Sequence, residues 1–98
     1  MMSAELMRES YSIQGGNFDT AGEVSGEIKT ILRDLGIEAS SLRRIVVVAF
    51  EAEMNVVMYA RRGTLTFILS DHEVNLEIRD EGPGIPDLAL AFQEGYST

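Results

Sequence analysis

A long apolar segment with polar residues at helical spacing constrains the fold of this chain most. It spans residues 40–63, SSLRRIVVVAFEAEMNVVMYARRG. Glu51 and Asn55 lie four residues apart within it, so a helix places both on one face. Arg44 and Arg62 fall on the same stripe. Because an unpaired buried carboxylate is strongly unfavourable, the pattern predicts a buried helix whose polar stripe faces a group outside the helix.

The ends of this helix are marked by residues that suit helix termini. Ser40 or Ser41 is expected to cap the start, and Gly63 to close the end. The run of Val and Ile favours a strand locally, but periodic apolar residues continue to Tyr59, which favours one helix. Because the segment is apolar nearly all round, we expect it to lie between other layers.

The chain before this segment predicts a strand followed by a helix. Residues 7–13 alternate, with Met7, Tyr11 and Ile13 on one side, which is typical of a half-buried strand. A capping box formed by Thr20 and Glu23 predicts the start of an amphipathic helix. Gly36 follows its last apolar residues and is expected to end it in the left-handed conformation.

The chain after the long helix predicts a β-hairpin and then an irregular stretch. Residues 64–70 and 74–79 each place their apolar side chains on one face, with Asn75, Glu77 and Arg79 toward solvent. Residues 80–87 contain two glycines and two prolines, so no regular element is predicted there. Asp87 is expected to cap a short helix through residues 88–92.

Composition limits the partners and the compartment. The chain has 98 residues, 45% hydrophobic and 24% charged, which is typical of one ordinary domain. Its net charge of -8 argues against nucleic-acid binding, since phosphate contacts need clustered basic residues. Cysteine is absent, and we find no apolar run long enough for a membrane span or a signal peptide. The sequence predicts a cytoplasmic protein.

Two constellations suggest chemistry, and each has an ordinary structural explanation. For Glu51 and Asn55 the ordinary explanation is a solvent-facing stripe; the functional one makes Asn55 a Mg²⁺ ligand and Glu51 a general base. Asp80 with Gly82 and Gly84 is either a turn or a purine site, in which the carboxylate accepts the exocyclic amine.

Three other polar residues are predicted to have no role in a site. Glu53 and Arg61 are expected to be ordinary surface groups. His72 has no second His or Cys nearby, which argues against a metal site.

In order, Glu51-Ala52-Glu53-Met54-Asn55, a hairpin and Asp80-Glu81-Gly82-Pro83-Gly84-Ile85 resemble the Bergerat-fold ATP-binding domain. This domain is shared by the GHKL superfamily of gyrase, a large ATP-dependent chaperone, sensor histidine kinases and mismatch-repair ATPases. The chain looks most like the bacterial anti-sigma and stressosome switch kinases, from about Met7 onward. The resemblance implies an α+β two-layer sandwich that is incomplete at the C-terminus.

The resemblance also implies roles for individual residues. It makes Glu51 the catalytic base and Asn55 the magnesium ligand, with ATP and Mg²⁺ as cofactors. The nucleotide-binding residues that it implies are Asn55, Asp80, Gly82, Gly84 and Ile85. At Tyr59 many switch kinases have a histidine, so the role of this position stays open.

One departure from the family pattern changes what we expect of this chain. The family continues through an ATP lid, a second glycine box, a helix and a strand, whereas this sequence offers only Gly95 after Gly84. We therefore expect residues 1–98 to be a single ATP-binding domain lacking those parts, with weak nucleotide affinity and negligible turnover. The missing parts would uncover a sheet edge and apolar surface, which favours a homodimer through edge pairing or swapping.

The function implied by the resemblance is a serine/threonine kinase that phosphorylates a STAS-domain antagonist, in a pathway that controls a sigma factor. A non-catalytic module that binds a sigma factor or antagonist is an alternative, with nucleotide modulating its affinity. An ATP hydrolase in which Glu51 activates water is another. An acidic structural domain without a ligand is the least specific alternative.

Overall fold

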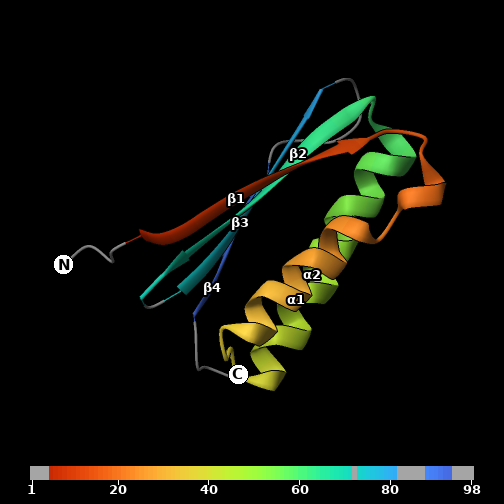
Figure 1. The fold of residues 1–98 in the computed structure, drawn as a ribbon. Helices are drawn as coiled ribbons and strands as arrows, with labels where there is room; N and C mark the ends of the chain where they lie inside the picture. The colour runs from red at the N-terminus through yellow and green to blue at the C-terminus, as the bar shows by residue number, and fades with distance from the viewer. Residues whose placement is uncertain (1–4, 72, 82–87, 94–98) are drawn as a thin grey trace.

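The computed structural model describes residues 5–71, 73–81 and 88–93. Within these ranges the elements are β1 (Glu5–Gln14), the short 3-10 helix η1 (Phe18–Thr20), α1 (Glu23–Asp34), α2 (Ala39–Tyr59), β2 (Arg62–Ser70), β3 (Glu73–Glu81) and β4 (Leu88–Gln93). The strands form one sheet in the order β1-β2-β3-β4, each antiparallel to the next, and both helices pack on one face (Figure 1). The predicted α+β two-layer sandwich is confirmed, and it is consistent with part of the Bergerat fold.

The alternation of the strands decides which side chains enter the core. In β1 the predicted inward residues are the least exposed, and Ile13 is fully buried. The hairpin is confirmed, with Leu65 opposite Ile78 and Phe67 opposite Leu76. These four residues are at most 5% exposed, so the face toward the helices is a continuous apolar layer.

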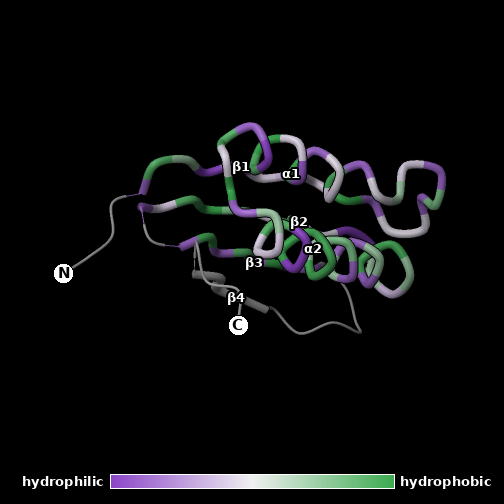
Figure 2. The backbone as a smooth tube through the Cα atoms, turned by 90° about the horizontal axis from the view of Figure 1, so that it is seen from below, coloured by the Kyte–Doolittle hydropathy of each residue, from purple (hydrophilic) through white to green (hydrophobic). Residues whose placement is uncertain are grey.

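Both helices contribute an apolar side to this layer. Their core residues are Ile28, Leu32, Ile45, Ala49, Val56 and Val57. Hydrophobic and hydrophilic stretches alternate along the two helices (Figure 2), as expected for helices with one buried side. No helix in the described ranges has the length and apolar character needed to cross a membrane.

The predicted start of α1 is wrong in detail, whereas its predicted end is confirmed. The helix begins at Glu23, and its N-cap is Gly22 with φ 99°, which has no side chain to bond the first amides. Thr20 belongs to η1, so the expected capping box does not form. Gly36 has φ 85°, the left-handed conformation that was predicted to end the helix.

The predicted ends of α2 are also wrong. Glu38 is the N-cap and accepts hydrogen bonds from the Ser40 and Ser41 amides, so neither serine caps the helix. At the other end α2 stops at Tyr59, and Gly63 lies inside β2. A free carboxylate at Glu38 is a stronger acceptor than a serine hydroxyl, which explains the first difference.

The outer side of α2 is exposed, which corrects the prediction that this helix lies between two layers. Its large apolar residues there are between 45% and 59% exposed: Val47, Phe50, Met58 and Tyr59. The described chain places a sheet on one side of α2 only, so apolar character all round did not imply burial all round.

The segment expected to be a short helix after Asp87 is the strand β4. Asp87 itself lies outside the described residues. β4 pairs antiparallel with β3, from Leu88 opposite Ile78 to Gln93 opposite Glu73. The sequence LALAFQ also alternates, as a strand requires. A helix of only six residues forms few hydrogen bonds within itself, whereas a strand beside β3 pairs its N–H and C=O groups with those of β3. The irregular stretch predicted for residues 80–87 is wrong at its start, since β3 continues through Glu81, and residues 82–87 lie outside the described residues.

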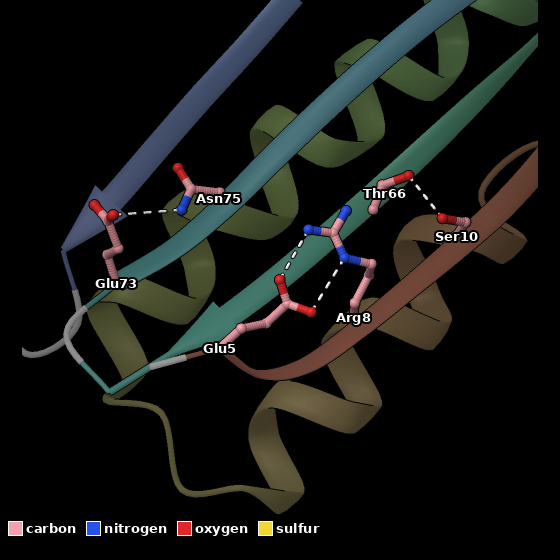
Figure 3. Close-up of polar contacts among 6 residues, drawn as sticks. All are labelled: Glu5, Arg8, Ser10, Thr66, Glu73 and Asn75. Carbon is pink, nitrogen blue, oxygen red and sulfur yellow. Dashed lines mark hydrogen bonds and ion pairs between the residues drawn. The ribbon is translucent and has the colours of Figure 1, made fainter. Parts of the chain in front are cut away.

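The face of the sheet away from the helices is polar (Figure 3). Arg8 donates to Glu5 at 2.8 Å, and the hydroxyls of Ser10 and Thr66 lie 2.8 Å apart across β1 and β2. The β3 residues predicted on this face are exposed or half-buried: Asn75, Glu77 and Arg79. The polar character of these residues suits a face of the sheet that meets solvent.

The N-cap of α2 predicts a pH dependence of stability. The Ser40 hydroxyl and the Ser40 and Ser41 amides bond the carboxylate of Glu38 and hold its pKa below the ordinary value of 4.5. A lowered folded-state pKa stabilises the protein above pH 4.5, and this contribution is lost as the pH falls through the folded-state pKa. We expect Glu38→Gln to lose less stability than wild type between pH 7 and pH 3 in thermal melts. Ser40→Ala should also lose less stability than wild type between pH 7 and pH 3. If both variants showed the pH dependence of wild type, the proposed role of Glu38 as the cap of α2 would be wrong.

Candidate nucleotide-binding site

Asp80 lies near the end of β3 and faces the helix layer. The buried residues of β3 are Val74, Leu76 and Ile78, so strand alternation places Asp80 on their side of the sheet. Its Oδ2 atom is buried, and no described residue hydrogen-bonds to it. An unsatisfied buried acceptor is unfavourable by about 1–3 kcal/mol. This oxygen is therefore suited to accept a hydrogen bond from a ligand.

Gly63 brings helix α2 close to this end of the sheet. It is the Cα partner of Asp80 across β2 and β3. A Cβ on Gly63 would lie 2.8 Å from Val56 Cγ2 and 2.9 Å from the carbonyl oxygen of Arg79. Only glycine allows such an approach of helix to strand. Since Asn55 directly precedes Val56, the structure brings Asn55 and Asp80 to the same end of the molecule.

Glu51 and Asn55 lie one turn apart on the same side of α2, as predicted. Both are exposed, which corrects the expectation of a buried polar stripe that needs a partner. The buried side of α2 is formed by other residues: Ser41, Leu42, Ile45, Ala49, Glu53, Val56 and Val57. Arg62 does not extend the stripe, because it is the first residue of β2.

Glu53 is the residue whose role the sequence analysis missed. It was predicted to be an ordinary surface group, but it is 1% exposed. Its Oε2 accepts from the amides of Gly22 and Val24 at 3.0 and 3.2 Å, and its Oε1 accepts from the amide of Ser25 at 3.0 Å. One signal for this was available, since Glu53 follows Ala49 by four residues on the core-facing side of the helix.

The other residues singled out in the sequence are placed as follows. Arg61 is exposed, as predicted, and Tyr59 is 59% exposed at the last position of α2. His72, Gly82, Gly84 and Ile85 lie outside the described residues, and their predicted roles stay predictions.

The outward side of α2 also borders a groove of about 570 Å³, lined by Ser40, Arg43, Arg44, Val47 and Val48. Within the described ranges no three His, Cys, Asp or Glu residues come together as a metal site. Protein sites for Mg²⁺ commonly use one or two side chains and complete the shell with phosphates and water. A single amide oxygen such as that of Asn55 fits this kind of site.

Comparison with known proteins identifies one distant relative. The chain is 28% identical over 74 residues to the serine/threonine-protein kinase RsbT of Bacillus subtilis (strain 168). The match covers 71% of this chain and 56% of the relative, so the chain spans little more than half of that protein. No protein-family model matches the chain. The sequence is thus related, at a distance, to a serine/threonine kinase.

Proposed function

We propose that this chain is the adenine-binding part of a serine/threonine protein kinase of the partner-switching type, whose substrate is a STAS-domain protein. The observation that carries the proposal is the buried Asp80 Oδ2 without a described partner, at the end of the sheet where α2 presents Asn55. The distant relation to a kinase and the two-layer fold support it.

The residues present fit an adenine nucleotide. An exocyclic amine supplies a hydrogen-bond donor, and Asp80 Oδ2 is the acceptor that lacks one among the described residues. Gly82 and Gly84 come two and four residues after Asp80 in the sequence, and residues without a side chain allow a flat base and its phosphates to approach the backbone. Ile85 would pack against the base.

The exposed side of α2 would carry out the chemistry. Bound Mg²⁺ would neutralise charge on the phosphates. The amide oxygen of Asn55 would hold the ion, and the carboxylate of Glu51, one turn earlier, would orient the acceptor hydroxyl and take its proton. Exposure suits both roles, because the nucleotide and a protein substrate must reach this side of the helix from solvent.

We further propose that the ATP lid and the second glycine box of the active kinase lie outside these 98 residues. After Gly84 the sequence contains one glycine, Gly95, so a glycine-rich phosphate loop is not encoded in this stretch. These 98 residues would then supply the base-binding half of the site.

One observation favours a second candidate function, a non-catalytic module that binds a sigma factor or antagonist. The apolar residues on the outer side of α2 are about half exposed, and exposed apolar patches commonly mark protein contacts. In that case nucleotide would only modulate the affinity for the partner.

Calorimetry with Mg·ADP tests the adenine site. We expect wild type to bind ADP weakly and in preference to inosine diphosphate, in which an oxygen replaces the exocyclic amine. Asp80→Asn removes a charged acceptor worth about 1.5–3 kcal/mol, so its affinity for ADP should fall about 10- to 100-fold. Its stability should be unchanged or higher, because a neutral amide is less costly to bury than a charged carboxylate.

Asp34→Asn is the matched control for this experiment. Asp34 is at the end of α1, with a side chain 71% exposed, and pairs with Arg33 at 3.8 Å. It should bind ADP as wild type does. Equal affinity of wild type and Asp80→Asn, or equal binding of the two nucleotides by wild type, would refute the proposed adenine site.

A further inference from the structure

Glu53 joins the two helices through its carboxylate. The side chain comes from α2, and the three amides that it accepts from belong to the first turn of α1 and its cap: Gly22, Val24 and Ser25. The N-cap of α1 offers these amides no side chain, since it is glycine. A charged acceptor at a helix N-terminus is also favoured by the helix dipole. The contact is thus a capping interaction made between two helices.

The direction of this contact determines where the opposite side of α2 points. Two residues along a helix correspond to a rotation of about 200°. Glu51 and Asn55 are each two residues from Glu53, so both point away from the side that faces α1. While Glu53 holds the amides of α1, α2 cannot turn about its own axis without breaking those hydrogen bonds.

We infer that Glu53 is a positioning residue, which sets the rotation of α2 and thereby aims Glu51 and Asn55 at the nucleotide and its magnesium. This inference rests on the proposed function. Glu53 would not touch the nucleotide, because it is buried on the opposite side of the helix. It would act through Asn55, much as outer-shell groups orient metal ligands.

The chemistry of the contact makes Glu53→Gln a sharp test. The glutamine side chain has nearly the same shape, but it presents an NH₂ group to amides that are themselves donors. One of the two carboxylate oxygens is lost as an acceptor, and a donor faces a donor in a buried position. Glu53→Asp keeps the charge but is shorter by one CH₂ group, so it serves as a second variant if the glutamine variant does not fold.

Spin labels measure the rotation of α2 without any nucleotide. The chain has no cysteine, so Lys29→Cys on α1 and Met58→Cys on the outer side of α2 give a unique labelled pair. Lys29 and Met58 are both exposed, so labels should be tolerated. We expect Glu53→Gln to shift or broaden the distance between the labels measured by electron-spin resonance.

Val74→Ala is the control for loss of stability alone. Val74 is fully buried in β3, at the end of the strand away from Asp80. It should lower the melting temperature without changing the distance between the labels. All measurements are made well below the melting temperature of each variant, so that every sample is folded.

The functional measurement is the gain in ADP affinity on adding Mg²⁺. In Glu53→Gln this gain should fall about 10-fold or more, as for the loss of a group that orients a metal ligand, whereas Val74→Ala should keep it. An unchanged label distance in the folded Glu53 variant would overturn the inference. A changed distance with an unchanged magnesium effect would also overturn it. If wild type binds no Mg·ADP, the proposed function fails, and the label distance still decides whether Glu53 sets the rotation of α2.

Discussion

Replacing Glu51 with alanine is expected to lower phosphoryl transfer to a STAS-domain acceptor by about 10²–10⁴-fold, the usual contribution of a general base. Glu51 is exposed on the outer side of α2, so its removal should change neither the core nor the ends of the helix. The loss should therefore appear in the rate of transfer, while stability stays within about 0.5 kcal/mol of wild type. Transfer is measured with labelled ATP, on a version of the protein extended through the second glycine box.

The same variant separates the proposed kinase from the two alternatives. If the protein is a kinase, Glu51→Ala should still bind its partner nearly as well as wild type does. Phosphate release without a protein acceptor would instead favour an ATP hydrolase. Glu27→Ala, which removes an exposed carboxylate from α1, is the control and should leave transfer unchanged. Full transfer by Glu51→Ala would exclude Glu51 as the base.

Replacing Gly15 with alanine is expected to lower the free energy of unfolding by about 3 kcal/mol or more, out of a total of about 5–15 kcal/mol. A Cβ there would overlap the carbonyl oxygen of Ala60 and lie 2.6 Å from that of Arg61. These are backbone atoms, so no side-chain movement relieves the overlap. The amide of Gly15 also donates to the Arg61 carbonyl at 2.7 Å, which holds the end of β1 against the segment after α2.

Gly26→Ala is the matched control for Gly15→Ala. Gly26 lies inside α1, and a Cβ there would meet nothing within 4 Å. Alanine in a helix is favoured over glycine by about 0.5–1 kcal/mol, so this variant should be more stable than wild type. Urea unfolding of both variants measures the difference. If Gly15→Ala were as stable as wild type, the close approach of β1 to the end of α2 would be wrong.

Local patterns were sufficient to predict most of the elements. Alternation predicted β1 and the hairpin with the correct inward residues, because strand side chains alternate whatever they pack against. The periodic apolar residues predicted both helices, and Gly36 marked the end of α1 because of its left-handed backbone. For the site, the four-residue spacing of Glu51 and Asn55 placed them on one side of α2.

Whether those two residues are buried could not be predicted in the same way. Exposure depends on what lies outside the helix, and in the described chain the sheet covers only one side of α2. The secondary structure of residues 88–92 was mispredicted for a related reason. Their short apolar pattern suits a helix or a strand, and the edge of β3, distant in sequence at Glu73, decided in favour of a strand.

The amino-acid sequence by itself thus determined the period of each element and the order of the polar motifs along the chain. Only the tertiary structure decided which acceptor caps α1, a carboxylate about 30 residues later rather than the local pair Thr20 and Glu23. It also decided that Gly63 lies in close contact with Val56 and that Asp80 Oδ2 is buried without a described partner. The physical reason is that side-chain periodicity is a property of neighbouring residues. Hydrogen-bond partners and burial are chosen among all groups that packing brings together.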